Sequence, residues 1–255
     1  MKINKKDLLL DLKAILINFL IVFVSILYFE LLLYFNIHNS LNRFTIYNVL
    51  FLIPISFVFT SILGFNSKID NVLTIFILFI ISIFYIANLI YFKTFGSLFS
   101  ISMIGAGKDA VTNFWWSVGE TIKENILIVI LFELPIILFI VKIFVFKNIS
   151  CSYKLILKPF VLIIGIALWF LVVLSLGLSG KKDYTPYGAY HSRYVDTDTA
   201  SSKLGILPNT IVEIRYSIFG SNRQELIEVK EVEQVKTEPK KQEKFVGHVY
   251  DNCQS

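Results

Sequence analysis

The chain has 255 residues, of which 55% are hydrophobic, and its mean hydropathy is +0.68. The core of one soluble domain of this size cannot bury so much apolar surface, so the composition excludes an ordinary soluble domain and favours lipid as the surrounding medium. The formal net charge is +5, but the basic residues lie beside the apolar segments rather than in one patch, which argues against a nucleic-acid-binding protein.

Five apolar segments of 19 to 21 residues predict transmembrane helices over residues 15–35, 44–63, 72–92, 126–146 and 160–178. At 1.5 Å per residue, each is long enough to cross the ~30 Å hydrocarbon layer of a bilayer. The first segment is too long for the apolar part of a signal peptide and lacks a small-residue cleavage site, so we expect it to be retained. Residues 1–180 therefore predict an all-α integral membrane domain with five transmembrane helices.

The positions of lysine and arginine in the short loops predict a cytoplasmic N-terminus and an extracytoplasmic C-terminus. In this orientation nine basic residues near the spans lie inside and seven lie outside. The inner set is Lys2, Lys5, Lys6, Lys13, Lys68, Lys142, Lys147, Lys154 and Lys158; the outer set is Arg43, Lys93, Lys108, Lys123, Lys181, Lys182 and Arg193. The two cysteines, Cys151 and Cys253, then lie on opposite sides of the membrane, so we expect no disulfide between them.

Residues 93–125, between the third and fourth predicted spans, mix apolar and small residues. Trp115, Val118 and Ile122 recur there at helical spacing, and Trp115 and Trp116 are of the residue type that settles at the headgroup level. This pattern predicts an interfacial helix on the outer face. Two roles stay open for it, anchoring the bundle or contacting a lipid substrate.

Residues 181–221 follow the last span and predict an extracytoplasmic juxtamembrane segment with a short amphipathic helix. Its apolar stripe consists of Leu207, Ile211, Ile214 and Ile218, with Pro208 suited to the first helical turn. We expect this helix to pack on the membrane or on the bundle. Residues 222–255 are highly charged, which predicts a disordered linker that ends before any catalytic domain.

Glu30 and Glu133 lie inside predicted spans, where a carboxylate costs a few kcal/mol unless it is paired, protonated or facing water. One interpretation is a polar groove for a lipid headgroup that opens outward, with Lys93 or Arg43 as the counter-charge. The other, which we favour, is that the two glutamates pack helix against helix. Pro54 and Pro135 also interrupt spans, and we expect each to kink its helix.

No catalytic, cofactor-binding or metal-binding motif is present in the sequence. His38, His191 and His248 stand alone, and the chain has no HExxH, CxxC or GxSxG motif and no glycine-rich phosphate-binding loop. We therefore expect no catalytic residue, cofactor or metal site in this chain.

The order of these elements resembles the amino-terminal half of bacterial lipoteichoic acid synthase-like proteins. The resemblance is carried by five spans after a basic amino terminus, by YFKTFGSLFSISMIGAGKDAVTNFWWSVGETIKEN after the third span, and by SKLGILPNTIVEIRYSIFGS after the fifth. That family belongs to the sulfatase and alkaline phosphatase superfamily.

The resemblance implies that the chain is the membrane-anchoring module of a phosphoglycerol transferase in the bacterial cell membrane. In that family an extracytoplasmic domain with a manganese- or magnesium-activated threonine moves glycerol phosphate from phosphatidylglycerol to a cell-envelope polymer. Because the residues of that domain have no counterpart here, we expect the chain to be a fragment or a truncated product that is inactive alone. The implied partners are membrane lipids such as phosphatidylglycerol, envelope-synthesis proteins or a second copy of the chain. The alternative is a self-sufficient, non-enzymatic membrane scaffold or small transporter.

Overall fold

The computed structural model describes residues 5–40, 44–64, 67–101, 115–145, 153–182, 184–191 and 196–219. Of these residues 87% are helical, and none of them lies in a strand. The all-helical prediction is therefore confirmed for this part of the chain. The predicted tail over residues 222–255, Arg43 and both cysteines lie outside the described residues.

Three helices are long and apolar enough to cross a membrane. They are α1 (Lys5–His38), α4 (Ser67–Phe95) and a continuous helical stretch over Leu155–Ser179, which contains α8 (Lys158–Ser175) between two short 3-10 turns. Each contains one of the predicted spans, over residues 15–35, 72–92 and 160–178. Hydropathy therefore identified these three helices correctly.

The other two predicted spans are broken, so the count of five is not confirmed. Residues 44–63 form α2 (Ile46–Leu50) and α3 (Leu52–Ile62), which together are shorter than the usual spanning length. The predicted span over residues 126–146 contains α6 (Ile126–Phe132) and α7 (Leu134–Val145), which are bent by 44° relative to each other. The described residues thus contain three candidate membrane-spanning helices, or four if the bent pair is one span.

A proline explains the bend between α6 and α7. Pro135 has no N–H to donate to the carbonyl of Leu131, four residues earlier, so the helix ladder is interrupted there. The hydroxyl of Tyr28 in α1 donates to that carbonyl at 3.0 Å. A neighbouring helix thereby satisfies the backbone group that the proline leaves free.

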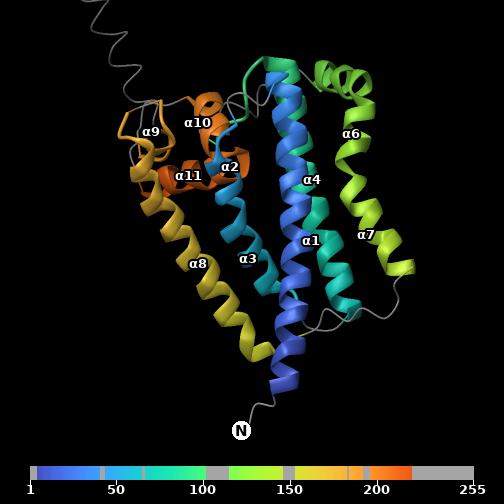
Figure 1. Ribbon diagram of the computed structural model, residues 1–255. Helices are drawn as coiled ribbons and strands as arrows, with labels where there is room; N and C mark the ends of the chain where they lie inside the picture. The colour runs from blue at the N-terminus through green and yellow to red at the C-terminus, as the bar shows by residue number, and fades with distance from the viewer. Residues whose placement is uncertain are drawn as a thin grey trace, which may run out of the picture.

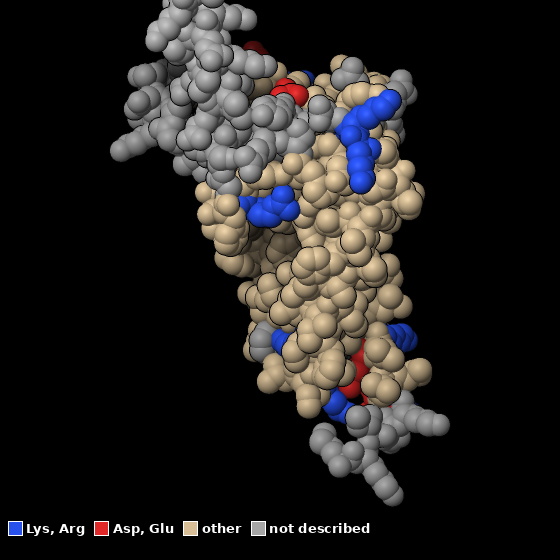
Figure 2. Space-filling view, turned by 90° about the vertical axis from the view of Figure 1, so that its left-hand side faces the viewer, with Lys and Arg blue, Asp and Glu red and all other residues tan. Residues whose placement is uncertain are grey.

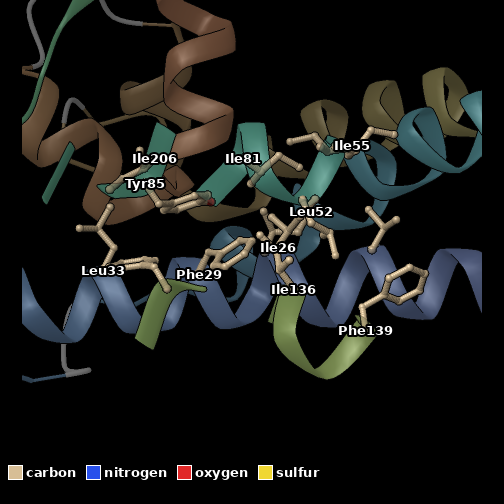
Figure 3. Packing of buried hydrophobic residues seen from close by; sticks show 14 of the residues in the cluster. Ile26, Phe29, Leu33, Leu52, Ile55, Ile81, Tyr85, Ile136, Phe139 and Ile206 are labelled. Atoms are coloured by element: carbon tan, nitrogen blue, oxygen red, sulfur yellow. The ribbon is translucent and has the colours of Figure 1, made fainter. Parts of the chain in front are cut away.

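The helices form a bundle in which α3 packs between α8 and α1, and α4 packs between α1 and α7 (Figure 1). The main core joins Phe29 and Leu33 of α1, Leu52 of α3 and Tyr85 of α4, all fully buried. Figure 3 shows Tyr85 between Phe29 and Leu33 on one side and Ile206 on the other. The core thus extends from the long helices to the segment that follows them.

Three further helices lie at the end of the bundle opposite the N-terminus: α9 (Pro186–His191), α10 (Thr197–Leu204) and α11 (Ile206–Phe219) (Figure 1). Helix α11 runs across the axis of α1. Residues 115–124 are also helical and lie across the same end, with Trp115 and Trp116 exposed. The predictions of a helix within residues 93–125 and of a helix within residues 181–221 are confirmed. The contact of these helices with a membrane surface stays a prediction.

Charged side chains gather at the two ends of the bundle. The face of the molecule in Figure 2 shows a wide uncharged band, with lysine, arginine and acidic residues above and below it. At the N-terminal end Lys154 pairs with Asp11 at 3.7 Å. This distribution matches a helix bundle that crosses an apolar layer.

A polar contact at the N-terminal end of the bundle fixes the turn between α3 and α4. Gly64 has φ +89°, and its N–H donates to Asp70 at 2.8 Å. The Tyr153 hydroxyl donates to the Thr60 carbonyl at 2.6 Å. Burial, reinforced by the negative charge of Asp70, raises the pKa of the Tyr153 phenol, so it remains protonated and keeps donating.

Replacing Gly64 with alanine is expected to destabilise the protein by about 2–4 kcal/mol, because a Cβ atom there overlaps the Tyr153 ring in addition to the strained φ. Thermal unfolding in detergent measures the loss. Gly96→Ala is the matched control, since Gly96 has φ +75° but open space around its Cβ position. Equal losses in the two variants would show that the contact with Tyr153 contributes nothing.

Candidate functional site

Glu30 of α1 binds the first turn of α11. Its side chain is fully buried. One carboxylate oxygen accepts from the Tyr85 hydroxyl at 2.6 Å, and the other accepts from the backbone N–H of Ile206 at 2.8 Å. The first N–H groups of a helix have no partner within the helix and favour a negative charge. Glu30 therefore acts as a cap for a helix that begins 176 residues later in the sequence.

Gly205 permits this contact. Its φ of +96° is strained for residues with a side chain, and a Cβ atom there would lie 3.1 Å from the nearer oxygen of Glu30. Glycine thus ends α10 and lets the backbone of α11 approach the carboxylate. The positive φ and the close approach to Glu30 both depend on the absence of a side chain at Gly205.

Glu133 makes a separate hydrogen bond to α4. It lies at the break between α6 and α7, is half-buried, and accepts from the Ser82 hydroxyl at 2.7 Å. Ser82 and Tyr85 are three residues apart on α4, so the two glutamates approach the same side of that helix. The structure does not pair the glutamates with each other, and each binds its own partner on α4.

Aromatic rings fill the space beside the two glutamates. The residues that precede them, Phe29 and Phe132, meet the ring of Tyr85 with centroid distances of 5.7 and 6.4 Å, and lie 6.2 Å from each other. This geometry corresponds to glutamates that join helices rather than to an open polar groove.

Replacing Ser82 with alanine is expected to cost about 1 kcal/mol, because Glu133 loses one hydrogen bond but stays half-exposed and can find another donor. Thermal unfolding in detergent is the measurement. Ser61→Ala serves as control, since the Ser61 hydroxyl bonds only the carbonyl of Val58 in its own helix. A Ser82→Ala variant as stable as the Ser61 control would exclude a stabilising role for this contact.

A second buried carboxylate, Glu213 of α11, binds four donors. One of its oxygens accepts from the Ser100 hydroxyl at 3.1 Å and from the Ile101 N–H at 2.9 Å. The other accepts from the Thr197 hydroxyl at 2.9 Å and from the Asn209 amide at 3.1 Å. Glu213 thus ties α11 to α10 and to the segment that follows α4.

Helix α2 and the residue that caps it, Thr45, contribute three further bonds to the outer end of the bundle. The Thr45 hydroxyl donates to the Lys203 carbonyl at 2.6 Å, and the Asn48 amide donates to the Ser202 carbonyl at 3.4 Å. The Tyr47 hydroxyl donates to the Ser175 carbonyl at the end of α8 at 2.8 Å. The helices α1 and α2, and the segment that follows α4, therefore hold the outer helices through polar contacts.

Helix α11 turns its polar side inward. Asn209 and Glu213 are buried, together with Val212. In contrast Ile211, Ile214 and Ile218 of the predicted apolar stripe are 39%, 42% and 65% exposed. These three residues of the stripe therefore do not pack on the bundle, whereas packing of the stripe on a membrane stays a prediction. The opposite side of the helix faces inward because buried Glu213 needs the donors of Ser100, Ile101 and Thr197.

Lys93 and the tryptophans lie apart from this network. Lys93 is exposed, and no described carboxylate lies within ion-pair distance of it. Trp115 and Trp116 are exposed with their ring centroids 5.4 Å apart. The described ranges also bring together no group of three histidine, cysteine or acidic side chains that could hold a metal ion.

Sequence reasoning missed Tyr85 and Glu213. A tyrosine in an apolar span gives no signal of its own, because tyrosine is common in such helices. Glu213 does give one, since Asn209 and Glu213 are four residues apart in a segment that is otherwise apolar. A polar pair at that spacing indicates a second functional face on the helix.

No protein-family model, curated protein or solved structure matches the chain.

Proposed function

We propose that the chain is a multi-pass membrane module that holds α9, α10 and α11 in a fixed position on the extracytoplasmic face and so orients the chain that follows Phe219. The observation that carries the proposal is the bond from buried Glu30 to the first turn of α11. We further propose that it serves as the membrane-anchoring module of a lipoteichoic acid synthase-like phosphoglycerol transferase in the bacterial cell membrane.

A fixed orientation explains why a carboxylate is buried in α1. Simple anchoring needs only apolar helices, whereas an unpaired buried carboxylate is costly. The hydroxyl of Tyr85 in α4 offsets part of that cost within the bundle, and the N–H of Ile206 offsets a further part only when α11 is in place. Glu30 therefore couples the folding of the bundle to the position of the outer helices.

The distribution of basic residues supports an N-inside, C-outside orientation. Five lysines belong to the N-terminal end of the bundle, where α1 begins and α7 ends: Lys6, Lys13, Lys142, Lys154 and Lys158. Cytoplasmic loops are enriched in such residues. In this orientation α9 to α11 and the helix over residues 115–124 lie at the outer surface.

The transferase part of the proposal rests on the family resemblance of the sequence. In that family the phosphoryl transfer takes place in a separate domain with manganese or magnesium, so the chain contributes anchoring and orientation and no catalytic residue. Membrane lipids, including phosphatidylglycerol, are the partners that this role requires.

Depletion of the protein from its own cells tests this role. We expect the incorporation of radiolabelled glycerol into glycerol-phosphate polymer to fall, and to recover when the wild-type chain is restored together with the catalytic domain that it anchors. Recovery should be poor with Glu30→Ala and normal with Glu120→Ala, which replaces an exposed glutamate at the same face. Unchanged polymer synthesis after depletion would contradict the transferase role.

A further inference from the structure

An apolar groove lies between α3 and α8, with α11 at one end. Its volume is about 370 Å³, within the range of small-ligand sites. The wall includes Pro54 and Val58 of α3, Gly165 and Trp169 of α8, and Ile211 of α11. Figure 2 shows a hollow in the uncharged surface of the α8 side, below a basic side chain.

Gly165 brings the two walls of the groove together. A Cβ atom at this position would lie 3.1 Å from the Cβ of Phe57 and 3.2 Å from the Pro54 carbonyl, so α8 contacts the backbone of α3 here. The larger side chains on both sides of this contact, including Val58 and Phe170, form the rims. The result is a narrow slot with an almost purely apolar lining.

A basic residue lies one helical turn from the end of the groove. Arg215 follows Ile211 by four residues, so both are on the same side of α11, and helical side chains lean toward the preceding turn. The Arg215 guanidinium lies 4.8 Å from the ring centroid of Tyr190 and 4.7 Å from that of Tyr216. No described carboxylate lies within 4.0 Å of it, so the rings orient the charge without neutralising it.

Aromatic contacts connect this charge to the groove wall. Tyr190 stacks on Phe51 at 6.0 Å, and Phe51 packs on Trp169 at 5.0 Å. Trp169 lines the groove. The position of Arg215 is thus fixed relative to the slot by packed rings.

We propose that the groove binds an acyl chain of an outer-leaflet phospholipid whose negatively charged headgroup pairs with Arg215. Within the uncharged band the groove faces hydrocarbon, which makes an acyl chain its natural occupant, and the positive charge at the outer end complements an anionic headgroup. The exposed isoleucines of α11 extend the apolar surface at the same level. This inference rests on the proposed membrane orientation and does not require the transferase role.

Quenching of Trp169 by brominated lipids tests the site. In a Trp115→Phe, Trp116→Phe background Trp169 is the remaining tryptophan of the chain. The protein is placed in phosphatidylcholine vesicles that contain a small fraction of brominated phosphatidylglycerol, phosphatidylserine or phosphatidylcholine. We expect both anionic lipids to quench more strongly than phosphatidylcholine. Arg215→Gln should reduce their apparent affinity by roughly fivefold, the effect of one basic residue at a membrane surface.

Two variants separate the acyl and headgroup parts of the site. Val58→Phe fills the slot and should weaken quenching by all three lipids, whereas Arg215→Lys keeps the charge and should retain the anionic preference. Lys123→Gln, which removes an exposed charge from the helix over residues 115–124, should change nothing.

Equal quenching by the three lipids in the parent protein would overturn the proposal, as would a preference for phosphatidylglycerol alone. An Arg215→Gln variant with the anionic preference intact, or full quenching in Val58→Phe, would overturn it too. Because polymer synthesis is not the readout, these outcomes are independent of the test of the transferase role.

Discussion

Replacing Glu30 with alanine is expected to destabilise the protein by about 2–5 kcal/mol and to release α11 from the bundle. The substitution leaves the Tyr85 hydroxyl and the Ile206 N–H without their acceptor in a buried position. Thermal unfolding in detergent measures the stability, and limited trypsin digestion at Lys203 and Arg215 reports the release of α10 and α11. Faster cleavage at these two sites is the expected result.

Control variants separate the capping contact of Glu30 from a general effect of removing a negative charge. Glu120→Ala removes an exposed glutamate from the same face and should alter neither stability nor cleavage. Tyr85→Phe removes one of the two donors, so combining it with Glu30→Ala should cost less than the sum of the single losses. Additive losses would refute the contact between Glu30 and Tyr85 of α4, and an unchanged cleavage pattern in Glu30→Ala would refute the proposed link between α1 and α11.

Glu213→Ala is expected to cost about 3–5 kcal/mol, because four donors lose their common acceptor within a buried cluster. Thermal unfolding in detergent and limited trypsin digestion measure this effect as well. Glu213→Gln should recover only part of the stability, since its amide group presents one acceptor oxygen and turns an NH₂ group toward donors.

The two carboxylates hold the same helix from different sides. Once either is removed, α11 is already partly released, so the double variant Glu30→Ala, Glu213→Ala should lose less stability than the sum of the single variants. Strict additivity would mean that the two contacts act on independent parts of the fold. Cleavage at Arg215 that stays slow in Glu213→Ala would contradict the role assigned to Glu213.

Hydropathy predicted the long helices because their signal is local. Residues 15–35, 72–92 and 160–178 are continuous apolar segments, and each lies in a helix of spanning length. The segments over residues 44–63 and 126–146 are equally apolar but contain Pro54 and Pro135. A hydropathy average records their composition and not the hydrogen bonds that a proline removes, which is why the count of five was not reproduced.

The partners of Glu30 depend on contacts that sequence periodicity does not contain. Tyr85 and Ile206 lie 55 and 176 residues away, and only the packing of α1, α4 and α11 brings them together. The orientation of α11 is a similar case. Its isoleucine stripe predicted the helix correctly. The buried hydrogen bonds that Asn209 donates to Ser201 and that Glu213 accepts from its donors outside α11 decided which side faces inward.

The groove and the outer network give α11 two complementary sides. Its polar side fixes it to the bundle, and its apolar side, with Ile211 and Arg215, is directed to the surrounding medium. A helix arranged in this way needs an apolar environment at its outer surface, which is what a membrane interface provides. The orientation of the bundle in the membrane is therefore the premise of both proposals.

Labelling of the two natural cysteines in intact cells tests that premise most directly. Cys253 lies beyond α11, and Cys151 lies between α7 and α8. A membrane-impermeant thiol reagent should label Cys253 in intact cells, and Cys151 only after permeabilisation. Labelling of Cys151 in intact cells, or protection of Cys253 until the cells are opened, would contradict an outer position for α11.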